Sequence, residues 1–453
     1  MPISVDDFAR RCGGVPHGFS SGAKIEGFAF DSRDAKPGDL FLAIKGERVD
    51  GHDYCQGAMA GGAVGALVER SVDCPHILVA DLVDALAKFA RHARRGFSGP
   101  VIAVTGSVGK TTTKEFIAAA MSVSGSVLKN EGNRNSEYSS PLVWAELSPE
   151  HKSVVIEMGM RGAGQIAHLC SFTSPTVGVV TNIGSAHIEM VGSRAAIASA
   201  KSELLQALPT DSHAVLPQDD EFLPVLREAS GCEVITFGFS PEADCRITGY
   251  RALDLHRCAV RGRLHSDSFE VELPTVGKHQ ALNAAAAIAA AGAAGVSVSD
   301  AVAGLTGVDL PPMRMEMVER DGAFVLLDTY NASPDSTVAA IQVVCEVPCT
   351  GRRLAVLGEM LELGDFTEAG HRLVGKAVAE ADLDGVLLTG GATDYIRDEA
   401  TKRGYPANRI QSLSSLDLAE VARYLQTVNP GDLVLIKGSR ALELERALTE
   451  AGV

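Results

Sequence analysis

Paired cysteines are missing from this sequence of 453 residues. Its nine cysteines are an odd number and include no C-x-x-C pair. This pattern excludes a disulfide framework and a zinc ribbon as the basis of the fold, and it indicates reduced cysteines in the core. An uninterrupted apolar run of about 18 residues, which a membrane-spanning helix needs, is also missing. The N-terminus, MPISVDDFARRCGG, has acidic residues where a signal peptide needs a basic flank. We therefore expect no membrane insertion and a cytoplasmic location.

An excess of basic residues is absent as well. Lys and Arg number 41 against 57 Asp and Glu, so the net charge is 41 − 57 = −16. Binding along a nucleic-acid backbone needs the opposite balance, and we expect no nucleic-acid partner. The hydrophobic fraction of 46% and the charged fraction of 22% are ordinary for a globular chain and too apolar for general disorder.

The chain length and the sequence pattern predict several α/β domains. At about 150 residues per domain, 453 residues correspond to about three domains. From Val101 onward, short β-rich apolar runs alternate with helical patterns, which is typical of a mostly parallel α/β sheet. Here we expect strands at residues 101–105, 154–158 and 177–181, and helices at 110–121 and 193–205. The chemical motifs follow such strands, where open α/β sheets bind ligands.

A second alternating series begins near Phe324 and predicts an independent, Rossmann-like C-terminal domain. Its expected strands are residues 324–327, 353–357, 385–389 and 432–436. We expect a hinge at 307–314, with its pair of prolines, and a linker at the Arg- and Gly-rich stretch 91–100. The expected domains are therefore residues 1–98, 99–312 and 313–453. The Ala-rich tract 283–294 is either low complexity or a tightly packed helix.

A glycine loop between a strand and a helix carries the strongest chemical signal. Residues 101–114 read V-I-A-V-T-G-S-V-G-K-T-T-T-K. The glycines let backbone N–H groups approach phosphate oxygens, and the helix N-terminus adds partial positive charge. Lys110 is expected to reach the β- and γ-phosphates of a nucleotide, and the hydroxyl of Thr111 to ligate Mg²⁺. Val104 stands where the longer G-x-x-x-x-G-K-[ST] spacing needs its first glycine, so the loop is either a shortened relative or a chance match.

Three further residues lie near strand ends or in a helix. Glu157 ends the apolar run V-V-I-E-M-G, where a carboxylate commonly holds Mg²⁺. Taken alone, such a residue is more often a surface glutamate, but the glycine loop upstream favours the metal ligand. His187 closes T-N-I-G-S-A-H, and Lys201 lies in the helical stretch that follows. A lone histidine is usually structural and a lone helical lysine is usually solvated, and spacing alone does not decide otherwise.

Together these motifs resemble the Mur ligases, ATP-dependent amide-forming enzymes that build the peptide of the bacterial cell-wall precursor. Further matching segments at 31–54, 277–285, 328–334 and 357–364 extend the resemblance over nearly the whole chain. The last two, D-T-Y-N-A-S-P and L-G-E-M-L-E-L-G, are most similar to the branch that adds D-alanyl-D-alanine to UDP-N-acetylmuramoyl-tripeptide. The D-N-P-R pattern expected of the branch that adds the third amino acid is missing.

The resemblance implies the cofactors and the site residues. It implies ATP and two Mg²⁺ ions, with Lys201 carbamoylated; a desolvated amine can take up CO2 and become an anionic metal ligand. The implied catalytic residues are Lys110, His187 and Lys201. The implied metal ligands are Thr111, Glu157, His187 and Lys201. The implied ATP-binding residues are Thr105, Gly106, Ser107, Val108, Gly109, Lys110, Thr111, Thr112, Asn283, Arg314 and Asp328. The implied substrate-binding residues are Asp31, Ser32, Arg33, Lys45, His52, Asn133, Asn135 and Asn331.

Some of these roles are more specific. In the resemblance, Asn283 touches the adenine, while Arg314 and Asp328 close on the nucleotide. Residues 31–33 lie at the UDP end of the long substrate, in a uridine-nucleotide-binding N-terminal α/β domain. Asn331, from the Rossmann-like domain, is our candidate for orienting the dipeptide.

The sequence departs from the family downstream of the phosphate loop. The family pattern is roughly N-x-N-N-x-I-G-x-P, whereas residues 133–141 read N-R-N-S-E-Y-S-S-P. Ser136 replaces an asparagine, Tyr138 an apolar aliphatic residue and Ser139 a glycine. We expect ATP handling to survive these changes; they either alter recognition of the acceptor peptide or are neutral drift.

The implied reaction joins a carboxylate to an amine through an acyl phosphate, in peptidoglycan precursor synthesis. Its implied partners are the small molecules UDP-N-acetylmuramoyl-tripeptide and D-Ala-D-Ala, and we expect a monomer. Two alternatives share this chemistry: a Mur ligase that adds another amino acid, and a folate-polyglutamate type of ligase. An alternative of another class is an ATP-binding switch that hydrolyses ATP without ligation.

Overall fold

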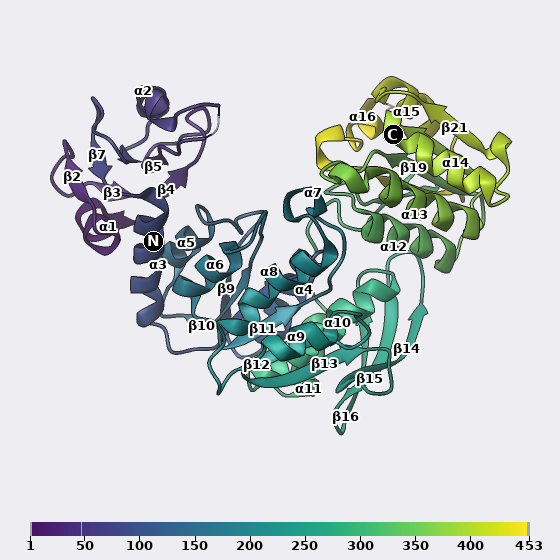
Figure 1. The fold of residues 1–453 in the computed structure, drawn as a ribbon, viewed down its shortest axis with the longest axis horizontal. Helices are drawn as coiled ribbons and strands as arrows, with labels where there is room; N and C mark the ends of the chain where they lie inside the picture. The colour runs from purple at the N-terminus through teal and green to yellow at the C-terminus, as the bar shows by residue number, and fades with distance from the viewer. Residues whose placement is uncertain (1, 47, 451–453) are drawn as a thin grey trace. The chain divides into compact units, whose positions relative to one another are not determined.

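The computed structural model describes residues 2–46 and 48–450 (Figure 1). The chain divides into two compact units. The first unit contains Met1–Ala103, Gly125–Met160 and Gly164–Thr176. The second contains Val104–Ser124, Arg161–Ala163 and Val177–Val453. Residues 1, 47 and 451–453, which fall in the expected domain ranges and in the segment 31–54, lie outside the described residues. The three expected domain ranges stay a prediction.

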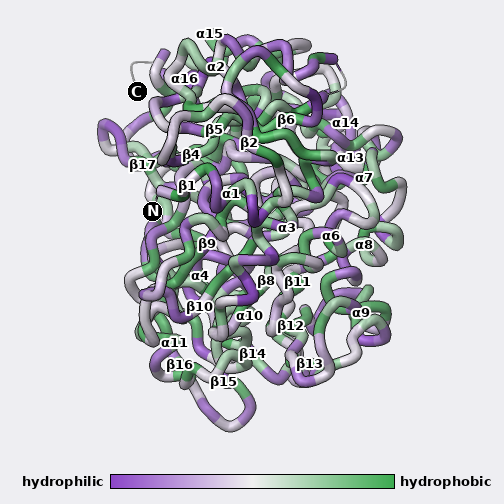
Figure 2. The backbone as a smooth tube through the Cα atoms, turned by 90° about the vertical axis from the view of Figure 1, so that its left-hand side faces the viewer, coloured by the Kyte–Doolittle hydropathy of each residue, from purple (hydrophilic) through white to green (hydrophobic). Residues whose placement is uncertain are grey.

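The N-terminal part of the first unit is a five-stranded sheet with helices. The strand order is β2-β7-β6-β5-β4, with β4 to β7 parallel and β2 antiparallel to β7. All four residues of β6 are buried, and the strand is largely hydrophobic (Figure 2). Leu67 joins one apolar cluster and its neighbours Ala66 and Val68 another, because successive side chains of a strand enter opposite faces. The elements are β1 (Ile3–Ser4), α1 (Val5–Cys12), β2 (Val15–His17), β3 (Lys24–Ile25), β4 (Gly27–Ala29), β5 (Asp39–Leu42), the 3₁₀ helix η1 (Gly51–Tyr54), α2 (Cys55–Ala60), β6 (Gly65–Val68), β7 (His76–Leu78) and α3 (Leu82–Arg95).

The rest of the first unit contains strand β10, which ends at Glu157. Strand β10 pairs in parallel with β9, and its last five residues are all buried. A parallel strand covered on both faces reads as a continuous apolar run, which is why V-V-I was recognisable as a strand. The elements are β8 (Val101–Thr105), whose first three residues belong to this unit, β9 (Ser126–Lys129), α5 (Ser140–Val143), η2 (Trp144–Glu146), β10 (His151–Glu157) and α6 (Gln165–Thr173).

The second unit begins with strands and helices that surround the glycine loop. Strands β8 to β16 belong to one nine-stranded sheet; in this unit β11 to β14 are parallel neighbours, and β14, β15 and β16 are antiparallel. The elements are α4 (Lys110–Ser122), β11 (Val177–Val180), α7 (Ile188–Val191), α8 (Arg194–Gln206), β12 (His213–Pro217), α9 (Leu223–Ala229), β13 (Glu233–Gly238), β14 (Cys245–Ala252), β15 (Cys258–Leu264), β16 (Asp267–Leu273), α10 (Lys278–Ala293) and α11 (Val298–Leu305).

The C-terminal part of the second unit is a Rossmann-like sheet. Its order is β17-β18-β22-β19-β20-β21, with all strands parallel except β17, which is antiparallel to β18. The elements are β17 (Glu316–Arg320), β18 (Ala323–Leu327), α12 (Pro334–Glu346), β19 (Arg353–Gly358), η3 (Gly364–Phe366), α13 (Thr367–Glu380), β20 (Gly385–Thr389), η4 (Gly391–Thr393), α14 (Asp394–Lys402), η5 (Ala407–Arg409), β21 (Ile410–Leu413), α15 (Leu418–Leu425), β22 (Leu433–Lys437), η6 (Arg440–Leu442) and α16 (Arg446–Glu450).

The predicted α/β class with mostly parallel sheets is confirmed. The expected strands 101–105 and 385–389 coincide with β8 and β20, and the other expected elements of the two series differ from the observed ones by a few residues at their ends. The Ala-rich tract belongs to α10, where residues 284–291 are all buried, so packing and not low complexity explains it.

Two expectations were wrong or incomplete. Residues 91–95 are the last turns of α3 and not a linker, because Arg94 Nε donates to Thr173 O at 2.9 Å and fixes the helix end. The antiparallel strands β14 to β16 were not predicted. Their alternation of buried and exposed side chains was the available signal, and it is clearest in β16.

Candidate functional site

The turn between β8 and α4 has no room for side chains at two of its glycines. Gly106 has φ 151° and Gly109 has φ 83°. A Cβ on Gly106 would lie 1.8 Å from Thr181 Oγ1, and a Cβ on Gly109 would lie 2.7 Å from Asn283 Oδ1. Glycine is therefore required at both positions by backbone conformation and by packing. Gly109 is also the N-cap of α4 and offers no side-chain cap, so this helix N-terminus retains its attraction for an anion.

A second loop, which follows β11, holds the glycine turn in shape. Thr181 Oγ1 and Asn182 Nδ2 both donate to Val108 O, at 2.6 and 2.9 Å. Val108 N–H donates to Asn182 Oδ1 at 3.0 Å, and Ser107 N–H to Asn182 O at 3.1 Å. Gly184 N–H donates to Ser107 Oγ at 2.9 Å. The conformation of the phosphate loop is thus fixed by residues more than seventy positions further along the chain.

Lys110 lies over the turn to which it belongs. Its Nζ donates to Gly106 O at 2.9 Å and to Ser107 O at 3.3 Å. Thr111 and Thr112 are buried in the first turn of α4, and Thr105 is fully buried at the end of β8. The ammonium and the uncapped helix N-terminus can bind the phosphates of a nucleotide, and the hydroxyl oxygen can ligate its Mg²⁺. These residues therefore fit ATP.

Asn283 lies directly beneath the turn. Its Oδ1 accepts a hydrogen bond from Thr113 Oγ1 at 3.1 Å, and its Nδ2 donates to Gln280 Oε1 at 2.9 Å. The side chain is buried, with 7% of its surface exposed. In the structure, Asn283 therefore ties α10 to α4; its predicted contact with adenine stays a prediction.

The three predicted catalytic residues lie within range of one another's charge. Lys201 has only 2% of its surface exposed, and burial together with the charge of Lys110 holds its pKa well below the usual value. Burial and Lys110 also lower the pKa of His187, whereas Glu362, with Oε2 at 3.0 Å from His187 Nδ1, opposes that shift. A buried amine of lowered pKa is partly neutral and hence nucleophilic, which is the state that carbamoylation requires.

Two acidic residues reach this loop from the C-terminal part of the same unit, and neither was predicted. Asp335 Oδ2 accepts hydrogen bonds from Ser185 N–H and Oγ, both at 2.9 Å. Glu362 pairs with His187. The only available signal was position: Asp335 follows the D-T-Y-N-A-S-P segment directly, and Glu362 lies inside L-G-E-M-L-E-L-G. Neither segment reveals its partner, because the two residues of each contact are 150 and 175 positions apart in the sequence, respectively.

Asp328 forms a partly buried ion pair that the sequence also did not reveal. Its Oδ2 lies 2.5 Å from Nζ of Lys437, which is 2% exposed and also donates to Asn331 O at 2.9 Å. Arg314 stacks on the ring of Tyr330, with the guanidinium carbon 3.9 Å from the ring centroid. The side chain of Asn331 is exposed and accepts from Ala332 N–H. The D-T-Y-N segment is thereby ordered around Lys437, and Arg314 packs on the tyrosine of this segment.

In the first unit, Glu157 is held by asparagines. Asn135 Nδ2 donates to Glu157 Oε1 at 2.7 Å, and Asn130 binds the backbone of Glu157 in both directions, at 2.8 and 3.1 Å. Glu157 is 3% exposed, so the alternative of a surface glutamate is wrong. Asn133 is exposed, and its O accepts from Asn135 N–H.

The departures from the family pattern have a local structural explanation. Ser136 and Ser139 bond to each other through their hydroxyls at 3.0 Å and through each other's N–H, and so begin α5. Tyr138 packs against the apolar core of the N-terminal sheet. The three replacements therefore form a self-consistent turn.

The predicted substrate residues of the N-terminal part differ in accessibility. Asp31 binds the exposed Arg33 through its carboxylate, and this contact lowers the pKa of Asp31 to about 2. Lys45 is exposed and Ser32 half-buried. His52 is buried; Nε2 accepts from Glu69 N–H at 2.9 Å, and Nδ1 lies 2.6 Å from Asp50 Oδ1. Both ring nitrogens of His52 are thus engaged within the protein, and its predicted contact with the substrate stays a prediction.

The metal-binding role of Thr111, Glu157, His187 and Lys201 stays a prediction. Among residues 2–46 and 48–450, no three His, Cys, Asp or Glu side chains come close enough to hold an ion. Mg²⁺ bound there would take the rest of its ligands from phosphate oxygens and water, which is the usual manner of this ion. Within the same residues, no helix is both long and apolar enough to cross a bilayer.

Three family descriptions match successive parts of the chain. Residues 24–94 match "Mur ligase family, catalytic domain", residues 104–291 match "Mur ligase middle domain", and residues 313–440 match "Mur ligase, glutamate ligase domain". These three matches support three family domains along the chain.

Whole-length relatives and structures agree with these matches. The chain is 38% identical over 440 residues to the UDP-N-acetylmuramoyl-tripeptide–D-alanyl-D-alanine ligase of Synechocystis, covering 95% of this chain and 93% of the relative. A crystal structure of MurF from Acinetobacter baumannii matches with a TM-score of 0.89 and 31% identity, over 100% of this chain and 99% of that one. The MurF ligase of Thermotoga maritima in complex with ADP matches with a TM-score of 0.81 and 32% identity, over 94% and 96% of the two chains.

Proposed function

This chain belongs to the Mur ligase family, and we propose that it joins D-alanyl-D-alanine to UDP-N-acetylmuramoyl-tripeptide with ATP, in peptidoglycan precursor synthesis. The observation that carries the ATP-dependent part is the glycine turn, where Lys110 lies over an uncapped helix N-terminus. The relatives named for this reaction carry the choice of substrates.

The proposal distributes the work over three domains. Residues 1–98 bind the UDP end of the substrate, with Asp31, Ser32 and Arg33 as the proposed contacts. Residues 99–312 bind ATP, and residues 313–453 bind the dipeptide, with Asn331 in an exposed position suitable for this. Asn135 lies beside Glu157, and Asn135 and Asn133 are proposed to face the peptide end.

In the proposed ATP site, Thr105 to Thr112 surround the phosphates, while Asn283, Arg314 and Asp328 contact the rest of the nucleotide. Lys110 exchanges its loop carbonyls for the β- and γ-phosphates. Thr111, Glu157, His187 and a carbamoylated Lys201 would hold Mg²⁺, which neutralises charge on the transferred phosphoryl group. Support for the carbamate is the burial and the lowered pKa of Lys201.

The proposed reaction has two steps. A terminal carboxylate oxygen of the tripeptide bonds to the γ-phosphorus of ATP, the bond from that phosphorus to the bridging oxygen breaks, and ADP leaves. The amine of D-Ala-D-Ala then bonds to the acyl carbon, phosphate leaves with the C–O electron pair, and the amine loses a proton. Lys110 stabilises the negative charge that develops on the phosphoryl oxygens, and the protein positions the three substrates.

Phosphate release across a panel of amines tests the function. The purified full chain is given MgATP and UDP-N-acetylmuramoyl-tripeptide with D-Ala-D-Ala, with D-Ala, with L-Lys or with no amine. In the presence of the tripeptide, we expect phosphate release with D-Ala-D-Ala and with none of the other amines. We expect no release when the tripeptide is omitted. Release with a single amino acid would indicate another branch, and release without any amine would indicate a switch.

Carbamoylation of Lys201 is tested separately by ¹³C NMR in ¹³C-bicarbonate buffer. We expect a carbamate signal that Lys201→Arg removes. Lys114→Arg is the matched control and should leave the signal unchanged, because Lys114 is also fully buried in a helix but is paired with Glu115 at 2.9 Å. A signal that survives Lys201→Arg, or no signal in the active enzyme, would contradict the carbamate.

A further inference from the structure

Lys437 is a buried lysine that the proposed reaction does not use. It ends β22, and only 2% of its surface is exposed. Its Nζ donates to Asp328 O at 3.3 Å, to Asp328 Oδ2 at 2.5 Å and to Asn331 O at 2.9 Å. An ammonium group has three N–H donors, so all of them are engaged within the protein. Lys437 has no donor left for a substrate, and any part that it takes in the reaction must pass through the residues that it binds.

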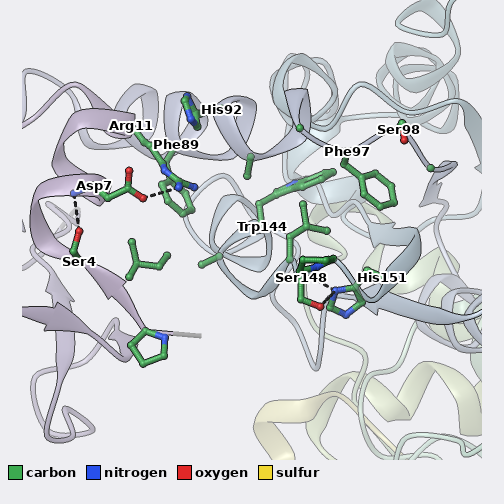
Figure 3. A pocket seen from close by; sticks show the side chains of 18 of the residues that line it. Ser4, Asp7, Arg11, Phe89, His92, Phe97, Ser98, Trp144, Ser148 and His151 are labelled. Atoms are coloured by element: carbon green, nitrogen blue, oxygen red, sulfur yellow. Dashed lines mark hydrogen bonds and ion pairs between the residues drawn. The ribbon is translucent and has the colours of Figure 1, made fainter.

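This contact differs from the ion pairs within single helices of the chain. In the first unit, Arg11 pairs with Asp7 at 2.6 Å beside a cavity of about 790 Å³ (Figure 3). Both residues belong to α1 and are one helical turn apart, so their pair supports that helix alone. Lys437 and Asp328 are 109 positions apart and lie at the ends of two adjacent parallel strands, β22 and β18. Their contact can therefore fix the loop after β18 relative to β22.

The four residues that follow β18 are held at both ends. Lys437 binds the first of them, Asp328, and the last, Asn331. Asp328 Oδ1 also accepts from Met315 N–H at 3.3 Å, and Asp328 N–H donates to Ile436 O at 3.0 Å. Asn331 is exposed, and Lys437 binds its backbone carbonyl. The ammonium group thus fixes the position from which the exposed side chain of Asn331 can contact a substrate.

The same ammonium group lies close to the helix that carries Asn283. His279, in the first turn of α10, is near enough for the charges of Asp328 and Lys437 to shift its pKa, in opposite directions. Asn283 lies one turn further along the same face of α10, and a Cβ on Gly109 would be 2.7 Å from its Oδ1. Lys437 and Asp328 therefore lie at the start of the helix that borders the phosphate loop.

We propose that Lys437 is a positioning residue for both the nucleotide and the dipeptide. This inference rests on the proposed function, in which Asp328 contacts the nucleotide and Asn331 the dipeptide. Without the ammonium group, two carbonyls and one carboxylate lose their donor, and residues 328–331 lose the contacts that fix their shape. Small displacements of binding groups are costly, so both substrates then bind less well. The UDP end of the third substrate is bound by residues 1–98 and is not affected.

The dependence on each substrate separates this role from a merely structural one. Lys437→Met in the full chain is expected to raise KM for ATP and KM for D-Ala-D-Ala by about tenfold each, and to change KM for UDP-N-acetylmuramoyl-tripeptide by less than about twofold. Calorimetry with MgADP measures the effect on the nucleotide without turnover. Lys402→Met, at an exposed lysine that ends α14, is the control and should change none of these values. A decrease in kcat with all three KM values unchanged would overturn the proposal, because a loss of folded enzyme gives that result.

A second comparison serves if Lys437→Met does not fold, since that variant leaves the carboxylate of Asp328 unpaired. Asp328→Asn is compared with the double variant Lys437→Met/Asp328→Asn, because both lack this carboxylate. The double variant is expected to have a KM for D-Ala-D-Ala about tenfold higher than that of Asp328→Asn, since only the double variant loses the bond to Asn331 O. Circular dichroism checks that each variant folds. Equal KM values for D-Ala-D-Ala would overturn the proposal.

The wild type distinguishes a failure of this inference from a failure of the proposed function. A wild type whose phosphate release does not depend on D-Ala-D-Ala would refute the function, and this inference with it. Release that depends on the dipeptide in the wild type, together with unchanged KM values in the variants, would refute the role of Lys437 alone.

Discussion

Asp335 accepts two hydrogen bonds from Ser185, one from its backbone N–H and one from its hydroxyl, both at 2.9 Å. Asp335 lies in the first turn of α12, whereas Ser185 follows β11. Between Asp335 and the phosphate loop lies Gly184, where a Cβ would be 2.5 Å from Asp335 Oδ2 and 3.2 Å from Ser107 Cβ. The C-terminal sheet is therefore connected to the phosphate loop through hydrogen bonds across a single glycine.

This connection predicts that Asp335 positions the loop. Asp335→Ala is expected to lower kcat for ligation by about tenfold to a hundredfold, because small displacements of reacting groups are costly. Ser185→Ala should have a similar effect, and the double variant should be no worse than Asp335→Ala alone, since both remove the same contact. Steady-state kinetics with circular dichroism measure this. Asp394→Ala, at the start of α14, is the control and should leave kcat unchanged; additive losses in the double variant would contradict the connection.

Lys110→Ala is predicted to abolish turnover while the fold persists. The ammonium is expected to stabilise the transferred phosphoryl group, so kcat/KM for ATP should fall by about 100-fold or more. Kinetics and a thermal melt measure the two effects. Lys88→Ala, at an exposed lysine of α3, should change neither. Near-normal turnover of Lys110→Ala would show that the glycine turn does not hold the reacting phosphate.

Gly109→Ala is predicted to lower the free energy of unfolding more than the same substitution does at a glycine of positive φ that has free space around it. Its φ of 83° costs an alanine about 1–2 kcal/mol, and the contact at 2.7 Å with Asn283 adds to this. Gly295→Ala is the control, because Gly295 has φ 88° with no atom within 4 Å of the added Cβ. Urea unfolding measures the free energy of unfolding of both variants. Equal decreases would show that the side chain of Asn283 moves away from the added Cβ without destabilising the protein.

The stability of the chain is predicted to depend on His279 in acid. Burial lowers the pKa of His279 from 6.5 to about 4, with Lys437 acting in the same direction and Asp328 against it. Between these values the unfolded chain binds a proton that the folded chain does not, so this contribution is complete above pH 6.5 and is lost as the pH falls towards 4.

The free energy of unfolding should therefore fall by about 2–3 kcal/mol more in the wild type than in His279→Asn over this range. Urea unfolding at several pH values measures the difference. His256→Asn, at an exposed histidine, is the control. Parallel pH profiles of the wild type and His279→Asn would refute the prediction.

Local sequence determined the elements whose own residues carry the signal. The glycine turn, β8 and α4 were predictable because a phosphate loop needs glycines, a lysine and a helix start at fixed spacing. The parallel strands were predictable because burial on both faces makes them continuously apolar. Resemblance to a family added the residue roles, and these stay predictions where no contact in the structure tests them.

Tertiary structure alone decided which residues act together. Asp335, Glu362 and Lys437 lie among ordinary charged residues in the sequence, yet each pairs with a predicted site residue or its loop more than 100 positions away. His52 is a shorter-range case: its two ring nitrogens contact Asp50, two positions away, and Glu69, seventeen positions away. Hydrogen bonds and ion pairs depend on distance in space, and spacing along the chain records that distance only within one element or turn.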